Sequence, residues 1–162
     1  MKYRRLHLNE LQELEQDFVK YLATNTIPGS DWEKMKKEKP EQAEAHIEVF
    51  SDLIFERTLQ AVEYLELKTP KDIRTFYCEK DKISMLGLLV EGETPLDLTR
   101  NESPEQMMQI VKRSGAKLKM YRAERTYREE REMELFKLLE QGALISKDGG
   151  MYKLLAGMKK QE

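Results

Sequence analysis

The stretch "IRTFYCEKDKISMLGLLVE", residues 73–91, predicts a β-hairpin and with it the class of the fold. Two runs rich in aliphatic, aromatic and β-branched residues, 73–78 and 82–91, flank the charged turn "EKD". This is the pattern of two antiparallel strands. The second run is apolar on both faces, so we expect its strand to lie in the interior of a sheet. "TPLDLT", residues 94–99, is predicted as a third strand.

Outside these strands the apolar residues recur mostly at helical spacing, every three or four positions. The sequence predicts helices over 8–24, 30–35, 41–67, 104–114 and 126–141 and a strand over 116–122. Around "KDGG" it predicts a C-terminal hairpin or, as the alternative, a strand plus a helical turn. The order is therefore α-α-α-β-β-β-α-β-α plus that hairpin. It predicts an α+β fold, with a mainly antiparallel sheet of four to five strands packed with helices. We divide it into an N-terminal helical extension, 1–39, and an α+β domain, 40–162, together forming one compact unit.

The composition predicts a soluble, cytoplasmic protein with no membrane contact. The 162 residues include 28 basic and 30 acidic ones, and no apolar run reaches the length of a transmembrane helix. No apolar stretch follows the basic residues near the start, so we expect no secretory signal. The single cysteine, Cys78, excludes an internal disulfide and a cysteine-clustered zinc site. His7 and His46 have no histidine or cysteine at ligand spacing, so we assign no metal and no cofactor.

Acidic residues around the hairpin raise the question of a hydrolytic cation site. The α-β-β-β-α-β order is also that of the restriction-endonuclease-like nucleases, which hold Mg²⁺ with carboxylates and place a lysine two residues after the second one. Asp81 and Asp97 stand at comparable positions, but the residue two after Asp97 is Thr99. We therefore interpret the acids as turn and strand residues and assign no catalytic residue. A divergent phosphodiesterase stays as the third hypothesis, to be dropped if Asp81 and Asp97 lie too far apart to share a cation.

The basic strip, residues 112–131, carries eight basic and three acidic side chains, with two tyrosines among them. Such a strip is typical of a surface that binds a phosphate backbone. Its candidate binding residues are Lys112, Arg113, Lys117, Lys119, Arg122, Arg125 and Arg128. A helix C-terminus, a solvent-facing strand and pairing with nearby glutamates also explain these charges. We favour this solvated-surface interpretation, and a nucleic-acid-associated protein is the alternative.

Trp32 is the one aromatic residue that we expect near a surface and the last candidate binding residue. An exposed Trp32 would suit an interface anchor, and a buried one would clamp the helical extension to the sheet domain.

Four stretches are similar to an uncharacterised family of short bacterial, intracellular proteins, a domain-of-unknown-function family. They are "MKYRRL" at the start, "EVFSDLIFE" in the long helix, "PLDLT" and "FKLLEQGALIS". The resemblance implies a stand-alone domain and brings no activity, cofactor or catalytic residue. We expect a non-enzymatic protein-binding or adaptor domain whose partner is another protein or a second copy of the chain.

Overall fold

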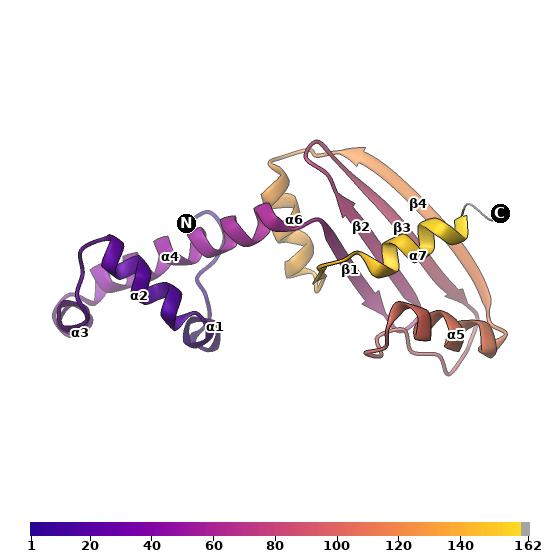
Figure 1. Cartoon of the computed structure of the whole chain (residues 1–162), viewed down its shortest axis with the longest axis horizontal. Helices are drawn as coiled ribbons and strands as arrows, with labels where there is room; N and C mark the ends of the chain where they lie inside the picture. The colour runs from indigo at the N-terminus through magenta and orange to yellow at the C-terminus, as the bar shows by residue number, and fades with distance from the viewer. Residues whose placement is uncertain (160–162) are drawn as a thin grey trace. The chain divides into compact units, whose positions relative to one another are not determined.

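The chain divides after Gln60 into two compact units, Met1–Gln60 and Ala61–Glu162. The computed structural model describes residues 1–159 and places seven helices and five strands in them (Figure 1). The division lies further along the chain than the predicted one after residue 39, because residues of the long helix that begins at Pro40 share a core with the helices before it. Met1–Gln60 is the N-terminal unit, and Ala61–Glu162 is the C-terminal unit.

The N-terminal unit is helical, as the apolar spacing predicts. Its helices are α1 (Leu8–Glu13), α2 (Glu15–Thr24), α3 (Gly29–Glu38) and α4 (Pro40–Ala61). The predicted helix over 8–24 is interrupted at Leu14, which caps both α1 and α2. The unit has a small core of apolar side chains from α2, α3 and α4 and from the turn between α2 and α3. Its members are Leu22, Trp32 and Ala43, with Phe18, Tyr21, Ile27, Met35 and Ile47 packed against them.

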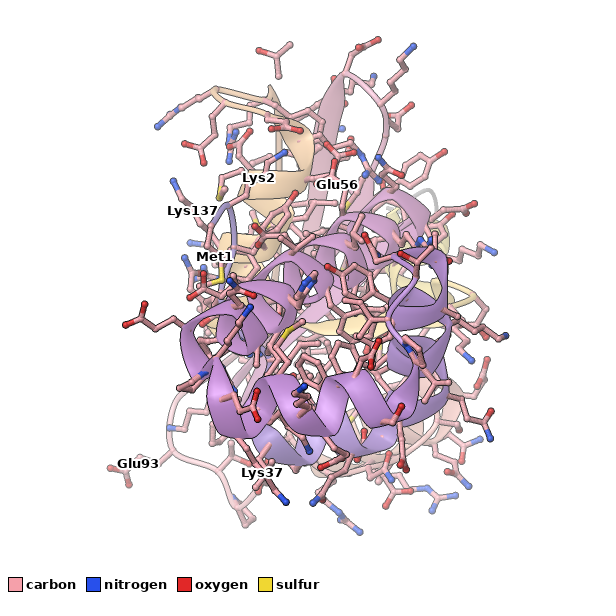
Figure 2. All side chains as sticks on the ribbon, turned by 90° about the vertical axis from the view of Figure 1, so that its left-hand side faces the viewer. Met1, Lys2, Lys37, Glu56, Glu93 and Lys137 are labelled. Atoms are coloured by element: carbon pink, nitrogen blue, oxygen red, sulfur yellow. The ribbon has the colours of Figure 1, made fainter. Side chains whose placement is uncertain are left out.

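The first residues of the chain are bound to α4. Both carboxylate oxygens of Asp52 accept main-chain N–H groups, from Lys2 at 2.7 Å and from Tyr3 at 2.9 Å. Lys2 Nζ also lies 3.4 Å from Glu56 Oε2, and both residues are labelled in Figure 2. The main-chain N–H of Leu6 donates to the buried hydroxyl of Ser51. The "MKYRRL" segment is therefore an ordered part of this unit.

The C-terminal unit contains a five-stranded antiparallel sheet, which confirms the predicted α+β class. Its strands are β1 (Tyr64–Thr69), β2 (Asp72–Cys78), β3 (Lys82–Glu91), β4 (Lys117–Thr126) and β5 (Leu144–Ser146). They lie in the order β4-β3-β2-β1-β5, and each pairs antiparallel with its neighbours. The predicted hairpin is β2–β3, and β3 lies inside the sheet as its apolar faces indicate.

The predicted helix over 41–67 is wrong in its last turn and a half. The helix ends at Ala61, and the chain enters β1 at Tyr64. Six residue pairs join β1 to β2, and Leu65 is fully buried opposite Phe76. The pairing with β2 therefore decides the conformation here, although the local spacing also suits a helix.

The predicted third strand over 94–99 is also wrong. The Asp97 carboxylate accepts the main-chain N–H of Thr99 at 2.9 Å and also its hydroxyl, which lowers the pKa of Asp97 below its ordinary value. This local turn competes with strand pairing. The N–H of Leu98 donates to the carbonyl of Pro70, so the fully buried Leu98 closes one end of the sheet.

The last third of the chain differs from the prediction at two places. The predicted helix over 126–141 is shorter, α6 (Arg131–Glu140), because β4 continues to Thr126 and pairs with β3 over ten residues. At the C-terminus the hairpin is wrong and the alternative, a strand followed by a helical turn, is nearer, since "KDGG" leads from β5 into the helix α7 (Gly150–Lys159). Met151 and Leu155, four residues apart, are buried on one side of α7.

The main core lies on the face of the sheet that α5 (Pro104–Ser114) and α7 cover (Figure 1). The helix α5 begins and ends as predicted, with a capping box between Ser103 and Gln106 and with Gly115 in the left-handed conformation after it. The core is formed by apolar residues of β2, β3, both helices and the loop after β3. Its members are Ile73, Leu86, Leu88, Val90, Leu98, Met107, Met108, Val111, Met151 and Leu155.

Candidate functional site

The basic strip does not form one surface. Side chains alternate between the two faces along β4, and Leu118 and Met120 join the core under α5 and α7. Arg122 therefore lies on that covered side of the sheet, where it borders a polar hollow of about 440 Å³. The opposite face carries three of the predicted cations, Lys117, Lys119 and Arg125.

The other cations of the strip lie outside β4. Lys112 and Arg113 occupy the last turn of α5, where their charge favours the helix dipole. Arg125 lies on the strand, whereas Arg128 lies in the loop after it and not on the helix predicted over 126–141.

Two of the predicted cations are paired within the fold. Arg125 Nη1 lies 2.7 Å from Glu134 Oε1, and Lys117 Nζ lies 3.7 Å from Glu91 Oε2. Within residues 1–159, no ion pair joins the remaining five to an acidic group. They are Lys112, Arg113, Lys119, Arg122 and Arg128. Pairing of this kind counts against a continuous phosphate-binding surface.

Asp81 and Asp97 do not form a cation site. Asp81 lies in the turn that enters β3, whereas Asp97 follows the far end of that ten-residue strand. Ten strand residues span roughly 30 Å, far more than two ligands of one cation allow. Within residues 1–159, no three histidine, cysteine, aspartate or glutamate side chains lie close enough to hold a metal ion. A cation site shared by Asp81 and Asp97 is therefore excluded, and with it the ground on which a phosphodiesterase was considered.

Trp32, which we expect near a surface, is buried in the structure. Only 9% of its surface is exposed, and its ring meets Phe18 edge-on at 5.1 Å between centroids. It packs with Leu22 and Ala43 inside the N-terminal unit. Trp32 therefore joins α3 to α2 and α4, rather than acting as an exposed anchor.

A groove of about 720 Å³ runs between α2 and α3, beside Trp32. Its wall is largely apolar, and its apolar members are Phe18, Val19, Leu22, Ala23, Ile27, Pro28 and Trp32. Three charged residues, Glu15, Glu33 and Lys36, also line it, with Lys36 Nζ 3.0 Å from Glu33 Oε1. In the sequence only Val19 hints at this groove, because it is an apolar residue next to Phe18, which is the residue of α2 that faces the core. Sequence reasoning missed it.

Exposed apolar side chains gather on the N-terminal unit. Among the described residues, seven large hydrophobic side chains are exposed, and five of them belong to this unit. These five are Met1, Leu8, Val19, Val49 and Leu53.

A polar cluster crosses the sheet face opposite α5 and α7, and the sequence does not predict it. The ring of Tyr121 on β4 lies directly over Gly87 on β3, and its hydroxyl donates to Asp72 on β2. Asp72 also accepts from Arg74 Nε at 3.1 Å. Burial and the hydrogen bond to Asp72 raise the pKa of Tyr121 to about 12. The cluster joins three strands, and its hydroxyl stays protonated at neutral pH.

His46 and Cys78 have structural surroundings. His46 Nδ1 lies 3.0 Å from the hydroxyl of Tyr21, so this histidine has a hydrogen-bond partner within the fold. Cys78 is buried at the end of β2. Burial raises the pKa of its thiol to about 12.

Cys78 should therefore be inert in the folded protein. Because the thiolate is the reactive form, we expect a disulfide reagent such as dithionitrobenzoate to modify it at least about a hundredfold more slowly than it modifies glutathione at pH 8. In guanidinium chloride one thiol per chain should react at the rate of a free cysteine. Rapid reaction of the native protein would contradict the burial of this strand end.

None of the helices in residues 1–159 combines the length and the apolar character needed to cross a membrane. The model of one protein family, described as a family of unknown function (DUF6495), matches residues 1–160. No curated protein and no solved structure matches the chain. The predicted resemblance to a domain-of-unknown-function family is confirmed, and its bacterial origin stays a prediction.

Proposed function

Because the chain belongs to this family of unknown function, we propose its role from its own surface: it is a non-enzymatic protein-binding domain that acts in the cytoplasm. Its binding site is the groove between α2 and α3, and the ligand is an apolar, helical segment of another protein. The groove itself is the observation that carries this proposal. It offers an apolar wall on a rigid pair of helices, which is how helix-binding domains capture an amphipathic partner.

The details of the groove support this choice. Val19 is 58% exposed at its edge, so an apolar side chain meets water where a partner would cover it. Trp32 packs edge-on against Phe18, so the half-buried Phe18 offers a partner an apolar surface that is already held in place. Glu15 at the side of the groove favours a ligand that carries a basic residue beside its apolar stripe, whereas the charge of Glu33 is already balanced by Lys36.

A protein ligand has more support than a nucleic acid. The cations of the basic strip lie on both faces of β4, on α5 and in a loop, and two of them are paired with glutamates. The apolar residues of the groove, in contrast, all line one hollow of the N-terminal unit.

Trp32 provides the test, because it is the only tryptophan in the chain. The probe is a tryptophan-free helical peptide of leucine, lysine and alanine, with leucines at steps of three and four. We expect saturable quenching or a spectral shift of Trp32 fluorescence, and we expect Val19→Asp to weaken peptide binding at least about tenfold, since the aspartate must be desolvated in an apolar site.

Val49→Asp is the matched control. Val49 is also an exposed valine on a helix of this unit, at 52%, but it does not line the groove. Its variant should bind the peptide like the wild type. Equal binding by both variants, or no spectral response of the wild-type protein, would overturn the groove as the binding site.

A further inference from the structure

The outer edge of β4 is unusually open to pairing. β4 is the terminal strand of the sheet, and among residues 1–159 it pairs with β3 alone (Figure 1). Its register with β3 is unbroken over ten residue pairs, and it contains neither proline nor glycine. Residues 122–126 at its end are all exposed. Long, regular edges without a proline or a bulge are the ones that accept another strand.

We propose that a second copy of this chain pairs antiparallel along β4, with Ala123 of the two copies facing each other on a two-fold axis. The two sheets then form one continuous sheet of ten strands. The paired segment comprises residues 120–126 of each copy. Main-chain hydrogen bonds at the strand edge supply the attraction, as in other cases of strand addition.

The charges on β4 select this register. In a two-fold antiparallel pair, residues that face each other must lie on the same side of the sheet. Centring on Ala123 places Arg122 of each copy opposite the partner's Glu124, so two attractive pairs form across the axis. Opposite charges facing each other stabilise strand pairs, and like charges destabilise them.

The neighbouring registers are worse. Centring on Arg122 places that arginine opposite itself and Lys119 opposite the partner's Arg125. Centring on Tyr121 places Lys117 opposite the partner's Arg125, and centring on Glu124 places that carboxylate opposite itself. Centring on Met120 brings no charges together. Among these positions, Ala123 is the one that pairs opposite charges.

Arg122 and Glu124 are both exposed in the single chain, although Glu124 already has partners within it. Arg122 is exposed, and within residues 1–159 its side chain forms no ion pair. Glu124 is 59% exposed, 3.3 Å from Lys82 Nζ and 3.3 Å from the Ser84 hydroxyl. Charged residues usually protect an edge strand by repulsion. Here they carry both signs, in an arrangement complementary to itself.

Disulfide trapping tests the register directly. Residues that face each other in an antiparallel pair are close enough for a disulfide, so Ala123→Cys should give a covalent dimer under mild oxidation. The control is Thr126→Cys, an exposed position on the same strand that faces the partner's Met120. Its yield of covalent dimer should be less than about one tenth of that of Ala123→Cys. The native Cys78 is buried and does not interfere.

Charge reversal tests the same register without a cross-link. Arg122→Glu and Glu124→Arg each create like-charge pairs, and each should weaken the dimer at least about tenfold in sedimentation velocity. The double reversal should return the dissociation constant to within about threefold of the wild type. Circular dichroism verifies that each variant is folded.

Three results would overturn the proposal: a wild-type monomer at every accessible concentration, equal trapping of both cysteine variants, or a double reversal as weak as the single ones. Val19→Asp, which tests the groove of the N-terminal unit, should leave the dimer intact. Loss of the dimer in that variant, without trapping at position 123, would assign the self-association to the groove instead. The two proposals can therefore fail separately.

Discussion

Arg131→Met should lower the free energy of unfolding of the C-terminal unit by about 3 kcal/mol. The guanidinium of Arg131, at the start of α6, donates to the main-chain carbonyls of Val62, Cys78 and Glu79, the last two at 3.2 and 3.0 Å. It thereby joins the start of β1, the end of β2 and α6. Methionine keeps most of the side-chain volume but leaves these carbonyls without their charged donor. That loss is expensive where water enters poorly.

Urea unfolding followed by the reactivity of Cys78 measures this effect, because Cys78 is a buried thiol in the same unit. Arg128→Met is the matched control. Arg128 is exposed, three residues earlier, and its side chain has no ion pair within residues 1–159. Its replacement should change the free energy of unfolding by less than about 0.5 kcal/mol. Equal effects of the two variants on the free energy of unfolding would show that the hydrogen bonds of Arg131 do not stabilise the contact between β1, β2 and α6.

Gly87→Ala should destabilise the protein by about 2 kcal/mol. A Cβ atom at Gly87 would lie 2.1 Å from Cζ of the Tyr121 ring, and the two adjacent ring carbons are nearly as close. The ring must therefore move away from β3, which breaks its hydrogen bond to Asp72. The backbone of Gly87 is not in the left-handed region, so the effect comes from the ring and not from backbone strain.

A double-mutant cycle isolates that cause. In a Tyr121→Ala background the clash is absent, and Gly87→Ala should cost less than about 0.5 kcal/mol. Gly157→Ala provides a matched glycine control, because no atom of the described residues 1–159 lies within 4 Å of a Cβ at that position of α7, the backbone of the helix itself aside. It should stabilise the protein by about 0.5–1 kcal/mol through helix propensity. A full penalty for Gly87→Ala without the tyrosine ring would contradict the steric explanation.

Several parts of the fold follow from short-range patterns. The β2–β3 hairpin is predictable because two apolar runs flank a three-residue charged turn. The helix α5 is predictable because Ser103, Pro104, Gln106 and Gly115 supply its start and stop signals within one stretch. These signals act between residues that are close in the chain, so no knowledge of distant partners is needed.

The errors lie where distant residues decide the conformation. The segment 64–69 alternates like a strand but also continues the spacing of α4, and its pairing with β2 determines which pattern applies. In 94–99 the local turn at Asp97 prevails over an apparent strand. The extension of β4 to Thr126 depends on the length of β3, which ends 26 residues before β4 begins.

For the candidate functional sites too, some features follow from local sequence and others depend on contacts between distant residues. The sequence by itself determined the α+β class, the antiparallel hairpin, the capped helix and the list of charged and aromatic residues, because composition and spacing are local properties. Only the tertiary structure decided what those residues can do together. It placed Asp81 and Asp97 beyond opposite ends of β3, distributed the basic strip over two faces of a strand, and formed a groove from Phe18 and Trp32 on separate helices. The physical reason is that a site depends on distances between side chains, and packing and strand pairing set those distances after the local elements have formed.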